Sequence, residues 1–312
     1  MRKILISSAA VSALLIAASP VYAAGKWVAA VPVSGSTATS IFGITNQNVV
    51  AGDYIDASGV QHGMTGPFDG SAYKSFDDSD GTTQARGIAD DGNVTGFDSG
   101  TLVPWERSPK GKLKTIVDKK GKPLNQLAQG LNSSDVFAAN SDDAKTGLSY
   151  GYTGKSSKLT STFSISIANN GFAGRGIDAA GDIVGWYLDT STNLQHGLLI
   201  VKGKASTIDV PNATYTVMEG MNDNGLATGQ FEDASGAIHG FIYTIKTKKF
   251  TQLDAPGSAL TQVWGINNNN VIAVSTTDVG SFVYCMTKKG CPKGGADAAV
   301  HPVHTHMAPA KP

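Results

Sequence analysis

Histidines are the residues of this chain whose type and spacing first suggest chemistry. His62, His196 and His239 each precede a glycine and occupy the same place in three similar stretches of sequence. A neutral imidazole can accept a proton or bind a metal ion. The corresponding places in three further stretches lack a histidine. We therefore interpret the three histidines as side chains that hydrogen-bond near their own strands, and as weak candidates for ligand binding.

A second group of histidines lies near the C-terminus. His301, His304 and His306 are spaced as H-x2-H-x-H in a tail rich in Gly, Ala and Pro. Imidazoles on a flexible tail can bind copper, nickel or zinc. Ordering such a tail costs conformational entropy, so we expect modest affinity unless another ligand joins. Metal binding by the tail is one alternative function of the protein.

Two further sequence motifs lack the context that their chemistry needs. Residues 147–151 match G-x-S-x-G, but a turn follows instead of the helix that a nucleophile elbow requires. Residues 154–156 resemble the end of a phosphate loop, yet Ser149 stands where its first glycine belongs. We identify no catalytic residue and expect no cofactor.

Turns rich in Asp and Asn, such as residues 90–92 and 222–225, resemble calcium loops. Calcium needs six or more oxygen ligands and a spaced series of carboxylates. The equivalent turn at residues 267–270 consists of four asparagines. We therefore predict hairpin turns, in which Asn, Asp and Gly supply left-handed conformations. Calcium binding at a single turn remains an alternative.

Two cysteines, Cys285 and Cys291, form a C-x5-C pair. In an exported chain two cysteines this close are expected to form a disulfide. The residues between them resemble a hairpin turn, so we expect the bridge to join two neighbouring strands. A zinc site is the rival interpretation, but the spacing is poor for zinc and no histidine is near.

These motifs lie in a chain that repeats itself. A glycine followed by an apolar residue, a polar turn and a short apolar run recurs with spacings of 44, 43, 46, 44 and 45 residues. The repeats begin near Gly43, Gly87, Gly130, Gly176, Gly220 and Gly265. A period of 40–45 residues is typical of solenoids and propellers. Each repeat also contains four short apolar runs bounded by turn residues, which favours strands.

The pattern predicts an all-β protein, a six-bladed β-propeller that spans residues 24–292. The last repeat lacks its fourth strand, while Lys26–Pro32 resembles the fourth strand of the preceding repeat. We expect this N-terminal strand to complete the last blade and to remove an exposed sheet edge.

The repeat resembles the extracellular HAF-type repeats of exported bacterial proteins. The matching pieces are Gly-Ile-Asn/Asp-x-x-Gly, Ile/Val-x-Gly-x-Tyr, His239–Phe241 and Asp254–Gly257, and the resemblance covers roughly Ile41 to Tyr284. It implies a secreted, propeller-like protein. The family brings no established activity, so the resemblance adds no catalytic residues.

The N-terminus predicts export. Met1–Lys3 is basic, Ile4–Ala18 is apolar, and Val21–Ala23 supplies the small residues of a cleavage site. This pattern is typical of a Sec-type signal peptide, here residues 1–23, so we expect a periplasmic or extracellular protein with no transmembrane segment after cleavage. Residues 293–312 form a His/Pro/Ala tail after the propeller.

The balanced charge of the chain gives no support for a nucleic-acid partner. The 312 residues contain 25 basic and 25 acidic side chains, so the overall charge does not favour nucleic-acid binding. Six lysines lie between Lys110 and Lys122, which we interpret as a solvated loop.

We expect a monomeric binding or scaffold module for an extracellular polymer, a surface protein or a small molecule. A hydrolase or lyase acting on an extracellular polymer is the other alternative, and it requires carboxylates or histidines that converge on one funnel.

Overall fold

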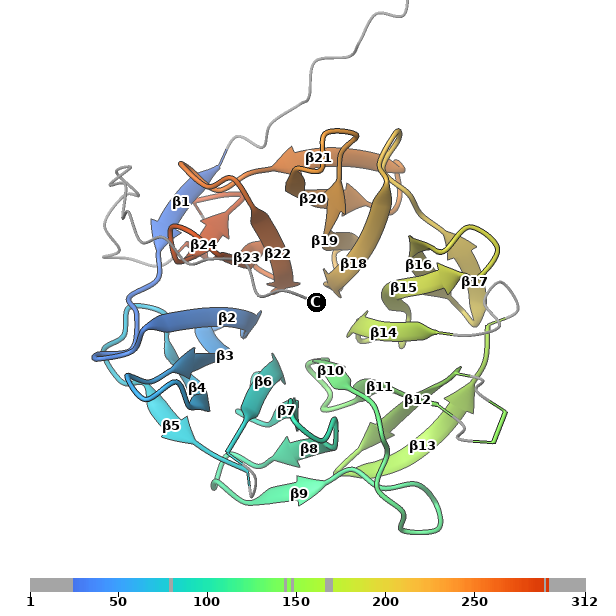
Figure 1. Cartoon of the computed structure of the whole chain (residues 1–312), viewed down its shortest axis with the longest axis horizontal. Helices are drawn as coiled ribbons and strands as arrows, with labels where there is room; N and C mark the ends of the chain where they lie inside the picture. The colour runs from blue at the N-terminus through green and yellow to red at the C-terminus, as the bar shows by residue number, and fades with distance from the viewer. Residues whose placement is uncertain are drawn as a thin grey trace, which may run out of the picture.

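The computed structural model of the protein describes residues 25–78, 81–142, 145–146, 149–165, 171–288 and 290–291. Every regular element in these residues is a β-strand, and the strands form six four-stranded sheets in a ring (Figure 1). The protein is therefore a six-bladed β-propeller, as the repeat predicts. Its described residues contain no helix long and apolar enough to cross a bilayer. The expected signal peptide and the histidine tail lie outside these ranges.

In blades one to five the chain runs outward, from the innermost strand near the axis to the strand at the rim, whereas the rim strand of blade six is the N-terminal β1 (Figure 1). Blades one and two comprise β2 (Ala38–Ile44), β3 (Val49–Ile55), β4 (Gln61–Pro67), β5 (Lys74–Phe76), β6 (Thr83–Ile88), β7 (Val94–Asp98), β8 (Pro104–Arg107) and β9 (Leu113–Thr115). Blades three and four comprise β10 (Ala128–Leu131), β11 (Phe137–Asp142), β12 (Ser149–Lys155), β13 (Lys158–Phe163), β14 (Phe172–Ile177), β15 (Ile183–Asp189), β16 (Leu194–Val201) and β17 (Lys204–Thr207). Blades five and six comprise β18 (Tyr215–Met221), β19 (Leu226–Glu232), β20 (Ile238–Thr244), β21 (Lys249–Leu253), β22 (Thr261–Ile266), β23 (Val271–Thr276), β24 (Ser281–Cys285) and β1 (Lys26–Ala29).

The turn between the first and second strand of each blade has one repeated conformation. In every blade the residue four positions after the repeat's apolar residue has a positive φ. This residue is always Asn, Asp or Gly. These residues are Asn48, Gly92, Asp135, Gly181, Gly225 and Asn270. Glycine adopts a positive φ without strain, and Asn and Asp tolerate it best among the other residues. The interpretation of these segments as hairpin turns is confirmed.

The glycine that opens each repeat is required by close packing of the innermost strands. A Cβ atom on Gly130 would lie 2.3 Å from the carbonyl oxygen of Arg175 in the next blade. A Cβ atom on Gly176 would lie 2.8 Å from the Cα atom of Gly220 in the blade after that. Each innermost strand therefore contacts its neighbour through backbone, which draws six strands close around the axis.

Apolar side chains pack between adjacent blades and form the core. For example, Ala51 of blade one packs in one cluster with Val94 and Trp105 of blade two. Trp105 is 2 % exposed and Val94 is fully buried. Because each blade buries both faces against its neighbours, closing the ring is what completes the core.

The last blade is closed by the N-terminal strand, as predicted. Strand β1 pairs antiparallel with β24, and Val28 lies opposite Val283. Trp27 packs on Tyr284 and Phe282, with ring centroids 4.8 and 5.9 Å apart. The first and last parts of the described chain are thus joined in one sheet (Figure 1).

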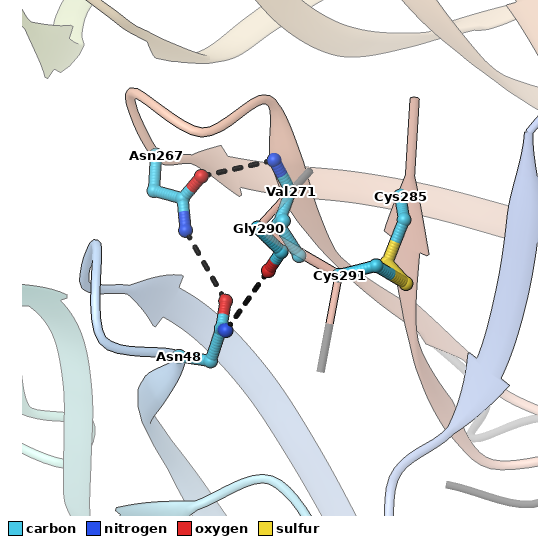
Figure 2. Close-up of a disulfide and its surroundings, with 6 residues drawn as sticks. All are labelled: Asn48, Asn267, Val271, Cys285, Gly290 and Cys291. Atoms are coloured by element: carbon cyan, nitrogen blue, oxygen red, sulfur yellow. Dashed lines mark hydrogen bonds between the residues drawn. A yellow bond between two sulfur atoms is a disulfide. The ribbon is translucent and has the colours of Figure 1, made fainter. Parts of the chain in front are cut away.

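The disulfide has a different setting from the one predicted. Cys285 ends β24, but Cys291 lies outside any strand, and their Cα atoms are 5.5 Å apart. The bridge therefore holds a short return of the chain, not two neighbouring strands. That return meets blade one, because Asn48 Nδ2 donates to the Gly290 carbonyl at 3.0 Å (Figure 2). Asn267 of blade six also donates to Asn48 Oδ1, at 3.4 Å.

The lysine-rich segment also differs from expectation. Residues 113–115 within it form β9, the outermost strand of blade two, so the segment is not a simple loop. A strand at the rim exposes most of its side chains to water. Lysine is tolerated at such a position and discourages pairing of the sheet edge with another chain. The strand therefore lacks the apolar pattern by which strands are recognised in the sequence.

Candidate functional site

The residue before each repeat glycine faces a cavity on the propeller axis. These six residues, one from each innermost strand, are Phe42, Arg86, Gln129, Arg175, Glu219 and Trp264. The cavity has a volume of about 80 Å³. That space exceeds the roughly 10–15 Å³ needed by one water, so it can take several waters or a small polyatomic group.

Arg86 packs among the rings of Phe42, Trp264 and Phe97, the last with its centroid 5.5 Å from the guanidinium carbon. Its guanidinium carbon lies 3.9 Å from the ring centroid of Phe42 and 4.8 Å from that of Trp264. Its Nη2 donates to Gln84 Oε1 at 2.7 Å. Cation–π contacts of this kind orient a guanidinium and compensate part of its lost hydration. Arg86 is thus fixed beside the axis with its plane defined.

Arg175 connects three blades across the cavity. Its Nη1 donates to Gln129 Oε1 at 2.5 Å and to Glu219 Oε2 at 3.2 Å. The side chain of Glu219 is only 3 % exposed. Burial raises the pKa of Glu219, while Arg175 and Arg86 act to lower it. The ion pair neutralises one of the two arginines and leaves Arg86 as the other positive charge.

Several buried donors around this cavity have no hydrogen-bond acceptor among the described residues. They are Nε and Nη1 of Arg86, Nε of Arg175, Nε2 of Gln129 and Nε1 of Trp264. A buried N–H group without a partner costs free energy comparable to a lost hydrogen bond. Unsatisfied groups in a folded protein often mark a ligand or water site. All of these groups are donors, so the cavity is suited to a group that accepts hydrogen bonds.

The charge near Arg86 depends on one more carboxyl. Asp53, on β3, is 5 % exposed and accepts a hydrogen bond from Gln61 Nε2 at 2.8 Å. Burial raises the pKa of Asp53 to about 7, although Arg86 and Gln61 act to lower it. Burial also lowers the pKa of Arg86 to about 10, and Arg175 contributes in the same direction. Arg86 therefore stays protonated at neutral pH, while Asp53 is partly neutral.

The other end of the axis is lined by apolar side chains and turns. The residue after each repeat glycine lines both the axial cavity and a second cavity of about 60 Å³ at the turns. These apolar residues are Ile44, Ile88, Leu131, Ile177, Met221 and Ile266. Beyond them the turns bond to one another, as when the Asp223 N–H donates to Asn268 Oδ1 at 2.9 Å. The six residues that precede the repeat glycines are thus bordered on one side by a ring of apolar side chains.

The three histidines singled out by the repeat do not meet at the axis. Each lies on the third strand of its blade and hydrogen-bonds an aspartate of the same blade. The His62–Asp77, His196–Asp209 and His239–Asp254 distances are 2.8, 2.8 and 3.1 Å. Burial lowers the pKa of His62, but Asp77 and Asp56 outweigh it and raise the pKa overall. The histidines therefore serve within their blades, and the convergence that a hydrolase on the funnel requires is not seen among them.

Ser149 is also occupied structurally. It is 7 % exposed, it donates to Asp142 Oδ1 at 2.6 Å and it accepts the Gly171 N–H at 2.9 Å. It lies at the start of β12 with no helix after it, so it is not a nucleophile elbow. No group of three His, Cys, Asp or Glu within the described ranges is placed to hold a metal ion. His301, His304 and His306 fall outside those ranges.

The axial ring was missed by motif reasoning, although the repeats contain a signal for it. When the six repeats are aligned on their glycines, the residue type before the glycine varies from blade to blade. In order it is Phe, Arg, Gln, Arg, Glu and Trp. The same strands keep the glycine and the following apolar residue constant. Variation at one place in an otherwise constant motif indicates a position that does not serve the fold alone.

Neither a family model nor a curated protein matches this chain. Solved propellers are similar to it in fold. A virginiamycin B lyase from Staphylococcus aureus has a TM-score of 0.50 at 11 % identity, over 83 % of this chain and 99 % of that one. TolB from Acinetobacter baumannii scores 0.51 at 10 % identity, over 78 % and 64 %. A gluconolactonase from Xanthomonas campestris scores 0.51 at 11 % identity, over 85 % and 96 %. They include a lyase and a gluconolactonase, so the similarity establishes the propeller fold and selects no function.

Proposed function

We propose that the protein is an exported binding module that holds the anionic group of a small ligand in its axial cavity. The observation that carries the proposal is the set of buried donors from Arg86, Arg175, Gln129 and Trp264 without acceptors among the described residues. The four residues line one cavity, and three of the five donors belong to the guanidinium groups of Arg86 and Arg175. A carboxylate or another oxyanion would satisfy these donors together.

Charge favours a single negative charge on the bound group. The ring contains two arginines and one glutamate, and Glu219 is paired with Arg175. Arg86 donates to the neutral Gln84 and packs on the rings of Phe42 and Trp264. Asp53 and Glu219 act on the charge of Arg86 from nearby but do not satisfy its Nε and Nη1 donors, so a bound anion would remove part of the cost of burying this guanidinium.

Export is part of the proposal. The basic and apolar N-terminus supports it, and so does the bond between Cys285 and Cys291, because disulfides persist in oxidising compartments outside the cytoplasm. An exported module of this size would meet small anionic metabolites or the charged ends of surface polymers. Fractionating cells that express the full chain, with mass analysis of the mature N-terminus, tests this part separately.

The binding proposal is tested by titration calorimetry of the chain beginning at Ala24 with acetate, succinate and inorganic phosphate. We expect one of these anions to bind with a stoichiometry of one and a dissociation constant of about 1 mM or lower. Arg86→Met should weaken that binding at least tenfold, and Arg86→Lys should give an intermediate loss because it keeps only the charge.

Arg107→Met is the matched control. Arg107 also stacks on an aromatic ring, that of Phe76 at 4.2 Å, but it lies on β8 and does not line the axial cavity. The Arg107→Met variant should bind the anion with the same affinity as the unaltered protein. Equal losses in the Arg86 and Arg107 variants, with both folded by circular dichroism, would contradict an axial site. So would the absence of binding by all three anions.

A further inference from the structure

Blade three carries a surface groove that the axial site does not include. The groove has a volume of about 340 Å³. Its floor includes Ser141, Tyr150, Tyr152 and Thr162 from strands β11, β12 and β13. Its wall is formed by Asp118 and residues 122–125, which belong to the connection that enters blade three from blade two. The volume falls within the range of roughly 300–1,000 Å³ that is common for small-ligand sites.

At this groove blade three differs from blades one, four and five. In blades one, four and five the histidine before the third-strand glycine packs on an aromatic residue of the second strand. The ring centroids are 4.9 Å apart for Tyr54–His62, 5.3 Å for Tyr187–His196 and 5.2 Å for Phe231–His239. In blade three the corresponding pair is Ser141 and Tyr150, which lie opposite each other in the ladder.

The replacement leaves space over the sheet. A serine stands where the other three blades have a large ring, so no aromatic side chain covers Tyr150 from the second strand. The wall is nevertheless anchored to this floor. Ser141 Oγ donates to Asn125 Oδ1, and Gln126 Nε2 donates to Asp142 Oδ2 at 2.8 Å. The groove is therefore bounded by a supported wall and not by a loose loop.

The lining combines aromatic and polar groups of both hydrogen-bonding senses. Tyr150 and Tyr152 are two residues apart on β12 and so face the same side of the sheet. Asp118 and Asp142 provide acceptors, and Lys122 and Thr162 provide donors. Two carboxylates and one ammonium leave little net charge. This lining does not suit an anion, and it differs from the arginine-rich axis.

We propose that this groove binds a saccharide. A sugar ring offers an apolar C–H face that packs on tyrosine rings, and hydroxyl groups that both donate and accept hydrogen bonds. The position also suits a polymer. Strands β12 and β13 are the two outer strands of their blade (Figure 1), so the groove lies toward the rim of the propeller.

The test uses saturation-transfer NMR and titration calorimetry with three disaccharides: maltose, cellobiose and N,N′-diacetylchitobiose. We expect at least one to bind with a dissociation constant of about 1 mM or lower. The decisive variant is the double change Ser141→Tyr with Tyr150→His, which restores the pair found at Tyr54 and His62. It should remain folded, and binding should weaken at least tenfold because the restored ring fills the groove.

Tyr150→Ala gives a second measurement that does not depend on accommodating a larger side chain. It should also weaken binding at least tenfold, whereas Tyr54→Ala in blade one should leave saccharide binding unchanged. Failure of all three disaccharides to bind would overturn the proposal. Binding that persists in the double variant would overturn it as well, because the sugar would then lie elsewhere.

Discussion

Asp53 and Arg86 show how single residues set the chemistry of the axis. Arg86 supplies a fixed positive charge, oriented by Phe42 and Trp264 at 3.9 and 4.8 Å. Asp53 is the nearby group whose charge changes near neutral pH, because burial raises its pKa to about 7. When Asp53 is ionised, its negative charge competes with a bound anion for the positive charge of Arg86. Anion affinity should therefore fall as pH rises through about 7, and Asp53→Asn should flatten that dependence.

The same carboxyl makes stability depend on pH. Because its pKa is raised from 3.8 to about 7 on folding, the native state binds more protons than the unfolded state between these values. The stabilising contribution is complete below the unfolded pKa and is lost as pH rises through the folded pKa. From pH 5 to pH 8 this loss amounts to about 2–3 kcal/mol.

Asp53→Asn should therefore reduce the difference in unfolding free energy between pH 5 and pH 8 by that amount. Urea unfolding of both proteins at the two pH values measures it. The asparagine keeps an oxygen that can accept the hydrogen bond from Gln61, so the comparison isolates the charge. An unchanged pH dependence in the variant would show that Asp53 titrates normally.

At the scale of the element, strand β14 offers a matched pair of glycines. A Cβ atom on Gly176 would lie 2.8 Å from the Gly220 Cα and from the Met221 nitrogen, which are backbone atoms that cannot move separately. A Cβ atom on Gly174 would meet side-chain atoms alone, the Ile183 Cγ2 at 3.3 Å and the Ala138 Cβ at 3.8 Å. Gly176→Ala should therefore cost about 1–3 kcal/mol of unfolding free energy, and Gly174→Ala clearly less. Thermal and urea unfolding compare them, and equal costs would refute backbone packing as the reason for the repeat glycine.

The disulfide acts on a second element, the return of the chain after β24. Its closed loop is short, so the chain-entropy contribution is about 2 kcal/mol. Cys291→Ser should remove this contribution and release Gly290 from Asn48 at the junction of blades six and one. Hydrogen exchange should rise at residues 286–291 and at the turn containing Asn48, while blades two to five keep their protection. Uniformly faster exchange would show that the bridge supports the whole ring.

At the scale of the whole molecule, ring closure depends on β1. Val28 is fully buried, and Trp27 packs on Phe282 and Tyr284. Deleting residues 26–32 removes these contacts and exposes the edge of β24, so we expect a loss of about 3 kcal/mol or more and a tendency to associate. A chain beginning at Gly25 is the control. Adding a synthetic peptide of residues 25–33 should restore part of the melting temperature, and an unchanged melting temperature on deletion would contradict closure by this strand.

The sequence by itself determined the architecture of the protein. Its glycine spacing, its turn residues and the likeness of Lys26–Pro32 to a fourth strand predicted six blades and their closure, because these features are local and repeat six times. It also predicted that His62, His196 and His239 bond within their blades. The strand at residues 113–115 and the setting of Cys291 were predicted wrongly, since neither follows the apolar pattern of the repeat.

Only the tertiary structure decided where the polar groups meet. Any two of Arg86, Arg175 and Glu219 are separated by at least 44 positions in the sequence, and no linear motif joins them. They come together because closing the ring brings the same place of every repeat to one axis. The groove of blade three likewise depends on Ser141 lying opposite Tyr150 and on a wall from the preceding connection. Such sites arise from contacts between repeats, and a pattern read within one repeat does not contain them.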